Sequence, residues 1–216
     1  SNVITMEKKT FVDQMQREVF IHNPPKRIVS LVPSLTEFLH FLGLDQEVVG
    51  ITKFCIHPEQ WFKNKERIGG TKKLKIQRVI DLQPDLVIGN KEENTIEDVA
   101  ELEHHVPVWM SDVNTWDDAI DMVHKLGPVL SKERLCEKLK ESIEELYSGV
   151  QSIGKNKSVL YFIWNNPLYV AGQGTFICSM LEKIGFRNAC TFSRYPSLDD
   201  IPAVCPHYIF LSSEPY

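Results

Sequence analysis

The chain has 216 residues, of which 43% are hydrophobic and 25% are charged, and its formal net charge at pH 7 is −5. This size and balance are typical of a globular protein with one large or two small domains. The mild acidity and the scattered basic residues argue against nucleic acid as the main partner. No apolar run approaches the roughly twenty residues that a membrane-spanning helix needs.

The cysteines and the N-terminus bear on the compartment. The five cysteines are odd in number and far apart, so they do not predict a disulfide framework. The segment before Phe11 lacks the apolar stretch of a secretory signal, and its Ser1-Asn2 start is typical of what remains after a tag is cleaved. Two alternatives stay open: a signal has been removed, or the protein is cytoplasmic, which Met6 as a native start would favour.

The first predicted elements surround a short buried strand. Residues 11–21 predict an edge hairpin, which a stiff turn at residues 23–25 follows. Residues 28–32 form an apolar run that predicts a strand buried on both faces, and Pro33 ends it. Ser34 and Glu37 have the spacing of a capping box, which predicts a helix from Ser34 to Gly43.

The next hundred residues predict an α/β lobe. A strand at 48–51 precedes a polar stretch at 52–75, which we expect to be a functional loop because long loops in compact domains usually serve a function. Then come a helix at 76–82, a strand at 86–89, a helix at 95–103, a strand at 106–110, and a helix at 116–126 that stops at Gly127-Pro128. Helices that alternate with apolar strands predict a mostly parallel sheet.

Residues 131–150 carry apolar side chains at helical spacing between charged ones, which predicts one amphipathic helix of about twenty residues. The α/β pattern then restarts with a strand at 159–164, a helix at 176–184 that Gly185 closes, and a strand at 208–212. We therefore predict an α/β fold of two lobes, at 20–128 and 156–216, joined by a rigid helix at 129–152. Because the sequence stops just past a strand where a helix would follow, we expect further C-terminal residues.

Several local motifs resemble a known family. They are PKRIVSL at 25–31 with Pro33-Ser34 and Thr36-Glu37, VVG at 48–50, LQPDLVI at 82–88, Ala171-Gly172 through Thr175-Phe176, and CPHYI at 205–209. Together they resemble the helical-backbone class of substrate-binding proteins of ABC importers, which carry cobalamin, ferric siderophores, haem or bare metals. The resemblance covers residues 19–213, and the cobalamin-binding members are the most similar.

The resemblance implies a ligand cleft between the lobes, no catalysis, no intrinsic cofactor, and a monomer in the periplasm or at the envelope. It implies a bound cobalamin, haem or ferric siderophore as ligand, and an ABC permease at the membrane as partner. An exposed carboxylate on each lobe would dock onto permease arginines, and the aligned positions are Glu66 and Asp199. Thr71 and Asn90 stand where family members carry aromatic residues beside a corrin, so the identity of the ligand stays open.

Aromatic and imidazole groups dominate the candidate site, because aromatic walls bury the flat faces of a macrocycle or a catecholate chelate. His57 would supply an axial nitrogen to cobalt or iron, with a plain hydrogen-bonding role as the alternative. The alternative explanation for the aromatic residues is that they pack in the core, and the alternative for Lys91 is that it belongs to a solvated loop. The candidate ligand-binding residues are Pro33, Ser34, Phe54, His57, Trp61, Asn90, Lys91, Trp164, Tyr169 and Gly172.

Evidence for catalysis is thin. Cys178 begins a predicted helix among apolar neighbours, which favours burial over reactivity. Gly172-Gln173-Gly174 lacks the third glycine of a dinucleotide motif, and no phosphate loop is present. Because a fold alone does not determine function, the alternative to transport is a cytosolic corrinoid- or metal-handling protein or an enzyme. The native gene start would discriminate the two.

Overall fold

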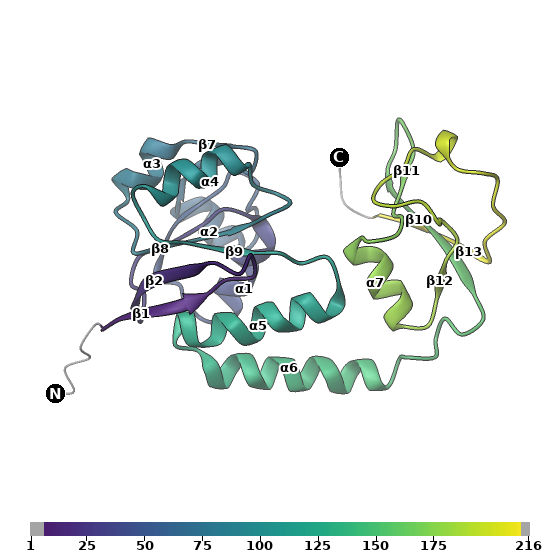
Figure 1. The fold of residues 1–216 in the computed structure, drawn as a ribbon, viewed down its shortest axis with the longest axis horizontal. Coiled ribbons are helices and arrows are strands. Elements are labelled where there is room, and N and C mark those ends of the chain that lie inside the picture. The colour runs from purple at the N-terminus through teal and green to yellow at the C-terminus, as the bar shows by residue number, and fades with distance from the viewer. Residues whose placement is uncertain (1–6, 213–216) are drawn as a thin grey trace. The chain divides into compact units, whose positions relative to one another are not determined.

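The computed structural model describes residues 7–212, and its contacts divide the chain into two compact units. Unit 1 comprises the residues up to 112 together with 122–138, and unit 2 comprises 113–121 together with the residues from 139 onward. Helices α5 (Trp116–Leu130) and α6 (Glu133–Ser148) therefore each contribute residues to both units (Figure 1). Met6 and residues 213–216, on which two of the expectations depend, lie outside the described residues.

Unit 1 is built on a five-stranded parallel sheet in the order β5-β4-β3-β8-β9. Its strands are β3 (Ile28–Ser30), β4 (Val48–Ile51), β5 (Glu66–Arg67), β8 (Leu86–Asn90) and β9 (Val108–Ser111). The chain runs from the central β3 outward to β4 and β5, and then crosses back to β8 and β9 on the other side. The predicted α/β lobe with a mostly parallel sheet is confirmed.

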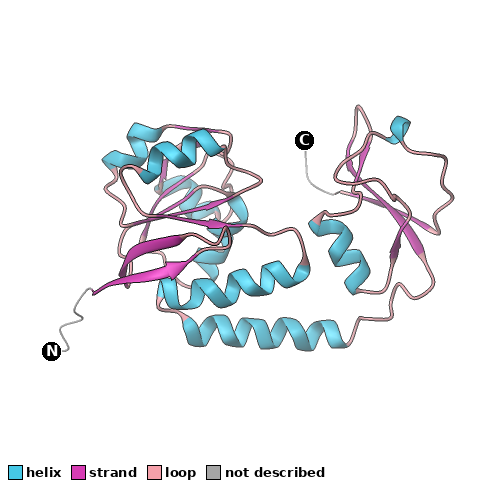
Figure 2. Ribbon diagram, in the orientation of Figure 1, coloured by secondary structure: helices cyan, strands magenta, loops and turns pink. Residues whose placement is uncertain are grey.

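Helices flank this sheet because its central strands are apolar on both faces. They are α1 (Pro33–Phe41), α2 (Glu59–Asn64), α3 (Ile76–Asp81) and α4 (Ile96–Glu103). Val29 and Val87, on the neighbouring strands β3 and β8, are fully buried. Figure 2 shows α3 and α4 side by side. None of the helices formed by residues 7–212 combines the length and apolar character needed to cross a membrane.

The start of α1 differs from the prediction, and its end agrees. Val32 is the N-cap, Pro33 takes the first turn, and no side chain caps the helix, so the capping box at Ser34 is wrong. Proline suits this position because its ring presets φ and its missing N–H would have no partner there. At the other end Gly43 has φ +68°, and Leu44 N–H donates to Leu39 O at 3.2 Å, which is the Schellman arrangement.

The predicted loop at 52–75 is largely structured. It contains α2, the edge strand β5, and a small antiparallel pair of β6 (Gly69–Gly70) and β7 (Lys73–Leu74). Burial of Ile68 and Leu74 stabilises this segment. Elements of two residues carry no periodic pattern, which is why the sequence did not indicate them.

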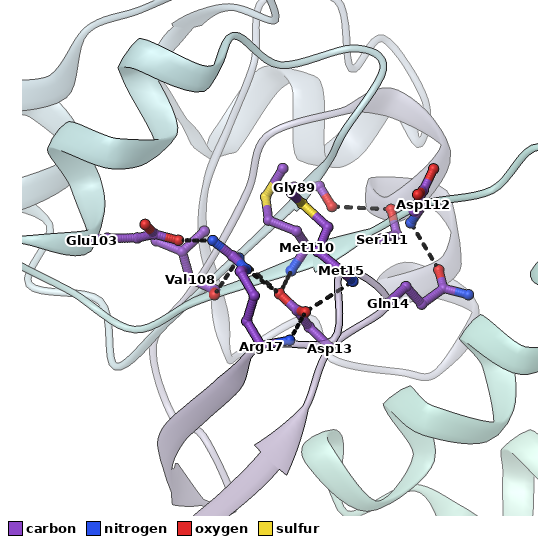
Figure 3. Close-up of polar contacts among 10 residues, drawn as sticks. All are labelled: Asp13, Gln14, Met15, Arg17, Gly89, Glu103, Val108, Met110, Ser111 and Asp112. Carbon is purple, nitrogen blue, oxygen red and sulfur yellow. Dashed lines mark hydrogen bonds and ion pairs between the residues drawn. The ribbon is translucent and has the colours of Figure 1, made fainter.

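The N-terminal hairpin is confirmed. β1 (Glu7–Val12) pairs antiparallel with β2 (Glu18–Asn23), and the turn between them covers the outer edge of β9. Met110 N–H donates to Asp13 Oδ2 at 3.2 Å, Gln14 N–H donates to Met110 O at 3.1 Å, and Asp112 N–H donates to Gln14 Oε1 at 3.0 Å (Figure 3). The turn therefore occupies backbone hydrogen-bonding groups of the edge strand β9, which could otherwise pair with a strand of another chain.

Asp13 is fully buried and is held by several donors. Arg17 donates from Nη2 at 2.7 Å, from Nε at 2.9 Å and from its own N–H at 3.0 Å, and Met15 N–H donates at 2.9 Å (Figure 3). Arg17 also pairs with Glu103 on α4. A buried carboxylate is tolerated only when it is paired and hydrogen-bonded, and this one is both.

The helices near the division differ from the prediction at their ends. α5 continues through Gly127-Pro128 to Leu130, because Asn23 Nδ2 donates to Pro128 O at 2.9 Å and to Val129 O at 3.1 Å. Ser131 has φ +54° and separates the two helices. α6 begins at Glu133 and ends at Ser148, so it is shorter at both ends than the helix predicted at 131–150.

Unit 2 is organised around β10 (Ser158–Trp164). It pairs in parallel with β13 (Tyr208–Leu211) and β12 (Arg187–Asn188), and antiparallel with β11 (Tyr169–Val170). Helix α7 (Phe176–Lys183) starts at its cap Thr175, whose hydroxyl accepts from Cys178 N–H at 3.2 Å. A short 3-10 helix, η1, spans Leu198–Asp200. β10, β13 and α7 agree with the predicted elements, whereas β11 and β12 were not predicted.

Candidate functional site

The strand order of unit 1 indicates where a ligand would bind. Ligands of open parallel sheets lie beside the carboxyl ends of the strands, where the strand order reverses, which here is between β3 and β8. Pro33 and Ser34 follow β3, and Asn90 and Lys91 stand at the end of β8. The structure therefore brings these predicted residues to one edge, which we call the carboxyl edge: the ends of β3, β4, β8 and β9.

The segment after β4 contributes apolar surface to the carboxyl edge. Phe54 and Ile56 are each 52% exposed, and Cys55 between them is fully buried. His57 is exposed in the same segment, just before α2. Both Phe54 and His57 are thus accessible, and their ligand-binding roles stay predictions. Ile56 is an exposed apolar residue that the sequence reasoning missed, although its place between Phe54 and His57 could have indicated it.

The polar residues after β8 are engaged within the protein. Asn90 Oδ1 accepts from Glu92 N–H at 3.0 Å and Glu93 N–H at 3.1 Å, and its Nδ2 donates to Ser111 Oγ at 3.1 Å. Lys91 Nζ forms an ion pair with Asp112 at 2.9 Å. Asn90 thus stabilises the turn after β8. Lys91 is exposed, so its ammonium group lies at the surface of the carboxyl edge.

Trp61 does not fit the expectation that it lines the ligand site. It is 2% exposed, its Nε1 donates to Asp45 Oδ1 at 2.8 Å, and its ring meets His40 edge-on at 5.2 Å. The depression beside it is also lined by Arg27 and Val48, which lie at the opposite, amino ends of the strands. Tryptophan packs here for area in the core of unit 1, and no sequence pattern separates that role from ligand contact.

Unit 2 has an open depression of about 520 Å³ at the carboxyl ends of β10 and β13. Trp164 in its wall is 48% exposed, and Leu168 from the following turn is 39% exposed. Tyr169, half-buried, pairs with Trp164 in the sheet register. The ligand-binding role of Trp164 stays a prediction, and Leu168 is an exposed apolar neighbour that only the folded turn shows.

Gly172 is buried and has a different role from the one expected. Its N–H donates to Arg194 O at 2.7 Å, and a Cβ at this position would lie 2.1 Å from Phe192 O. The glycine therefore permits a close backbone approach between two loop segments instead of offering surface to a ligand. Phe192 and Tyr195 on the second segment are 45% and 37% exposed.

The two carboxylates predicted to dock onto a permease are both exposed. Glu66 lies on the edge strand β5 of unit 1, and Asp199 lies in η1 of unit 2. Their docking role stays a prediction.

Neither redox nor metal chemistry is favoured by the buried thiols. Burial is the main cause that raises the pKa of Cys55 and the pKa of Cys178, so both remain protonated and weakly nucleophilic. Within residues 7–212, no group of three or more His, Cys, Asp and Glu side chains is placed to hold a metal ion.

Two proteins of known sequence are similar to this chain over most of its length. The chain is 30% identical over 193 residues to YvrC of Bacillus subtilis strain 168, an ABC transporter substrate-binding lipoprotein, and covers 60% of its length. It is 27% identical over 207 residues to a vitamin B12-binding protein of Vibrio campbellii, of which it covers 73%. These matches include 83% and 89% of this chain.

A solved structure shares the fold. It is a periplasmic heme-binding protein from Pseudomonas aeruginosa, with a TM-score of 0.69 and 26% identity, and the match covers 81% of this chain and 66% of that one. The family model described as periplasmic binding protein matches residues 28–214, so the chain belongs to the periplasmic binding protein family.

Proposed function

We propose that this protein is the substrate-binding component of an ABC importer and captures a metal chelate: cobalamin or another corrinoid, haem, or a ferric siderophore. The ligand would bind at the strand-end surfaces described above and would be delivered to a permease without chemical change. The names of the relatives support this proposal, because they are an ABC transporter substrate-binding lipoprotein, a vitamin B12-binding protein and a periplasmic heme-binding protein.

The observation that carries the proposal is the exposed apolar surface at the carboxyl edge. Phe54 and Ile56 remain half exposed just after β4, the strand that pairs with β3, and in unit 2 Trp164 is similarly exposed at the end of β10. Exposing such side chains to water is unfavourable unless a ligand covers them. Corrins, porphyrins and catecholates offer large flat faces that suit aromatic walls.

The polar residues would orient the chelate. Ser34 and Lys91, both exposed at the carboxyl edge, would donate hydrogen bonds to its carboxylate or amide substituents. His57 would contribute an axial nitrogen to the cobalt or iron. We expect His57→Ala to shift the visible absorption bands of a bound corrinoid or haem, and unchanged bands would show that His57 only lines the site.

We further propose a membrane permease as the partner, the periplasm or the cell envelope as the location, and a monomer as the working form. Glu66 and Asp199 would pair with arginines of the permease. Paired reversal, with Glu66→Arg or Asp199→Arg against an aspartate in the permease, would test this contact.

The deciding experiment is titration of the protein with aquocobalamin, haemin and a ferric siderophore. Binding is followed by visible absorbance and by quenching of its four tryptophans. We expect saturable one-to-one binding of one of these chelates. Riboflavin, a flat ring without a metal, is the control and should bind at least about tenfold more weakly, a difference of about 1.4 kcal/mol. Failure of all three chelates with folded protein would overturn the proposal.

A further inference from the structure

The Phe54 ring packs against Gly70 and lies close to the side chain of Lys53. A Cβ on Gly70, in the β6-β7 hairpin, would lie 3.1 Å from Phe54 Cε2, so the ring lies directly over this glycine. Lys53 Nζ lies 4.9 Å from the centre of the same ring. The ring is nevertheless 52% exposed, so part of it remains open to a ligand.

A buried network of hydroxyl and thiol groups ties the Phe54 segment to the turn after β3. Cys55 Sγ lies 3.1 Å from Thr36 Oγ1 on α1 and 3.1 Å from Thr52 Oγ1 at the end of β4. Thr36 Oγ1 also lies 2.8 Å from Ser30 Oγ, and all of these side chains are fully buried. Thr52 Oγ1 in addition accepts from Phe54 N–H at 3.3 Å.

The buried side-chain amide of Asn94 holds the β6-β7 hairpin, which carries Gly70. Asn94 is 4% exposed, and its Nδ2 donates to Thr71 O at 3.0 Å and to Leu31 O at 3.3 Å. Its Oδ1 accepts from Asn90 N–H at 2.9 Å. Asn94 thus connects the ends of β3 and β8 with the hairpin that carries Gly70.

We propose that Cys55, through its contacts with Thr36 and Thr52, and Asn94 are positioning residues that hold the Phe54 ring in one place before ligand arrives. Both side chains are buried, so their role is to position other groups and not to contact a ligand directly. The buried groups have fixed partners, so the segment loses little conformational freedom on binding, and affinity is gained through preorganisation. For its effect on affinity, this inference rests on the proposed function; the placement of Phe54 does not depend on it.

The test compares Cys55→Ala, Cys55→Ser and Asn94→Asp in the full chain. Serine retains a group that can donate and accept, so it should rescue the position that alanine loses. Asn94→Asp keeps the acceptor for Asn90 N–H but turns a carboxylate oxygen toward the carbonyls of Leu31 and Thr71. Cys136→Ala, which removes a buried thiol from α6, is the matched control.

Hydrogen exchange without ligand is the first readout. Ile56 N–H donates to Phe54 O at 2.9 Å, so its protection reports on the segment. We expect Cys55→Ala and Asn94→Asp to speed exchange at Phe54 and Ile56 by about tenfold, the effect of one lost buried hydrogen bond, while Cys55→Ser and Cys136→Ala leave it near that of the unmodified protein.

The dissociation constant for haemin or aquocobalamin is the second readout, and it should rise in parallel with the exchange rates. Unchanged exchange in Cys55→Ala, or faster exchange with unchanged affinity for a chelate that the unmodified protein binds, would overturn the inference. If the unmodified protein binds no chelate, the proposed function fails, and the exchange rates still decide whether these residues position Phe54.

Discussion

Asp13 shows how much one buried side chain can contribute to the free energy of unfolding. Asp13→Ala leaves Arg17 without its main partner and leaves Met110 N–H without an acceptor at the edge of β9. Arg17 is 31% exposed and keeps Glu103 as a partner, so the cost comes mainly from backbone donors left unsatisfied, and we expect the free energy of unfolding to fall by about 1–3 kcal/mol. Urea denaturation followed by tryptophan fluorescence measures it.

The control for Asp13 is Glu7→Ala, because Glu7 lies exposed on the neighbouring strand β1. Exposed substitutions usually change stability by less than about 0.5 kcal/mol. A loss below about 1 kcal/mol in Asp13→Ala would contradict a stabilising role for the turn.

The buried thiol of Cys136 should make the free energy of unfolding depend on pH in the alkaline range. Burial, with Glu133 adding, raises the pKa of the Cys136 thiol from 9.0 to about 11. Above pH 9 the thiol ionises in the unfolded chain while it stays protonated in the folded one, so the free energy of unfolding falls as pH rises to about 11. Two pKa units correspond to about 2–3 kcal/mol.

Cys136→Ala should remove this contribution and flatten the decline between pH 9 and 11. Urea midpoints measured across that range report the slope. The exposed Cys205 supplies the control, because Cys205→Ala should leave the slope unchanged. An equal slope in Cys136→Ala and the unmodified protein would contradict the prediction.

Individual site residues were predicted unevenly from the sequence. Phe54 and Trp164 are exposed at strand ends as expected, whereas Trp61 is buried. Trp61 lies inward because Asp45 accepts from its Nε1 and the His40 ring packs edge-on against it, and both partners come from another part of the chain. Burial depends on contacts distant in sequence, so residue type alone could not separate these roles.

At the scale of elements, Gly172 determines how the loops of unit 2 fit together. Gly172→Ala would place a methyl group 2.1 Å from Phe192 O, a backbone atom that cannot move aside cheaply. Overpacking of this kind costs about 1–3 kcal/mol. We expect a lower thermal midpoint together with a displaced segment at residues 190–197.

Gly149→Ala is the matched control in the same unit, because the nearest atom to its added Cβ would be Leu146 O at 3.6 Å. Differential scanning calorimetry of both variants gives the comparison. Equal midpoints for Gly172→Ala and Gly149→Ala would show that the backbone at Gly172 yields more easily than its contacts imply.

Whether a helix or strand could be predicted from the sequence depended on its length and on how regular its apolar pattern is. β3 and β8 were predicted because their apolar runs lie between turn residues. The Pro33 start of α1 was missed, because a serine and a glutamate at capping distance outweighed the proline in the sequence reading. α5 passes Pro128 because Asn23, far away in the chain, binds its last carbonyls.

At the scale of the whole molecule, the proposed ligand binding can be tested in each unit by one aromatic substitution. We expect Phe54→Ala and Trp164→Ala each to weaken chelate binding by about tenfold, because each removes an aromatic wall worth roughly 1–2 kcal/mol. Absorbance titration with the chelate that the unmodified protein binds measures the effect.

Phe20→Ala is the matched control, because Phe20 is 55% exposed on the N-terminal hairpin and lines a depression with Pro107 and Val108, at the amino end of β9. It should leave affinity unchanged. If Trp164→Ala binds as tightly as Phe20→Ala, the depression of unit 2 takes no part in recognition.

The sequence by itself determined the alternation of strands and helices, the parallel sheet and the family, because periodicity, turn residues and motifs are local properties. Only the tertiary structure decided that Asp13 covers an edge 97 residues away, that Gly172 serves a backbone contact, and which aromatic side chains stay exposed. These features depend on partners distant in the chain, and their free energy arises only when folding brings those partners together and excludes water.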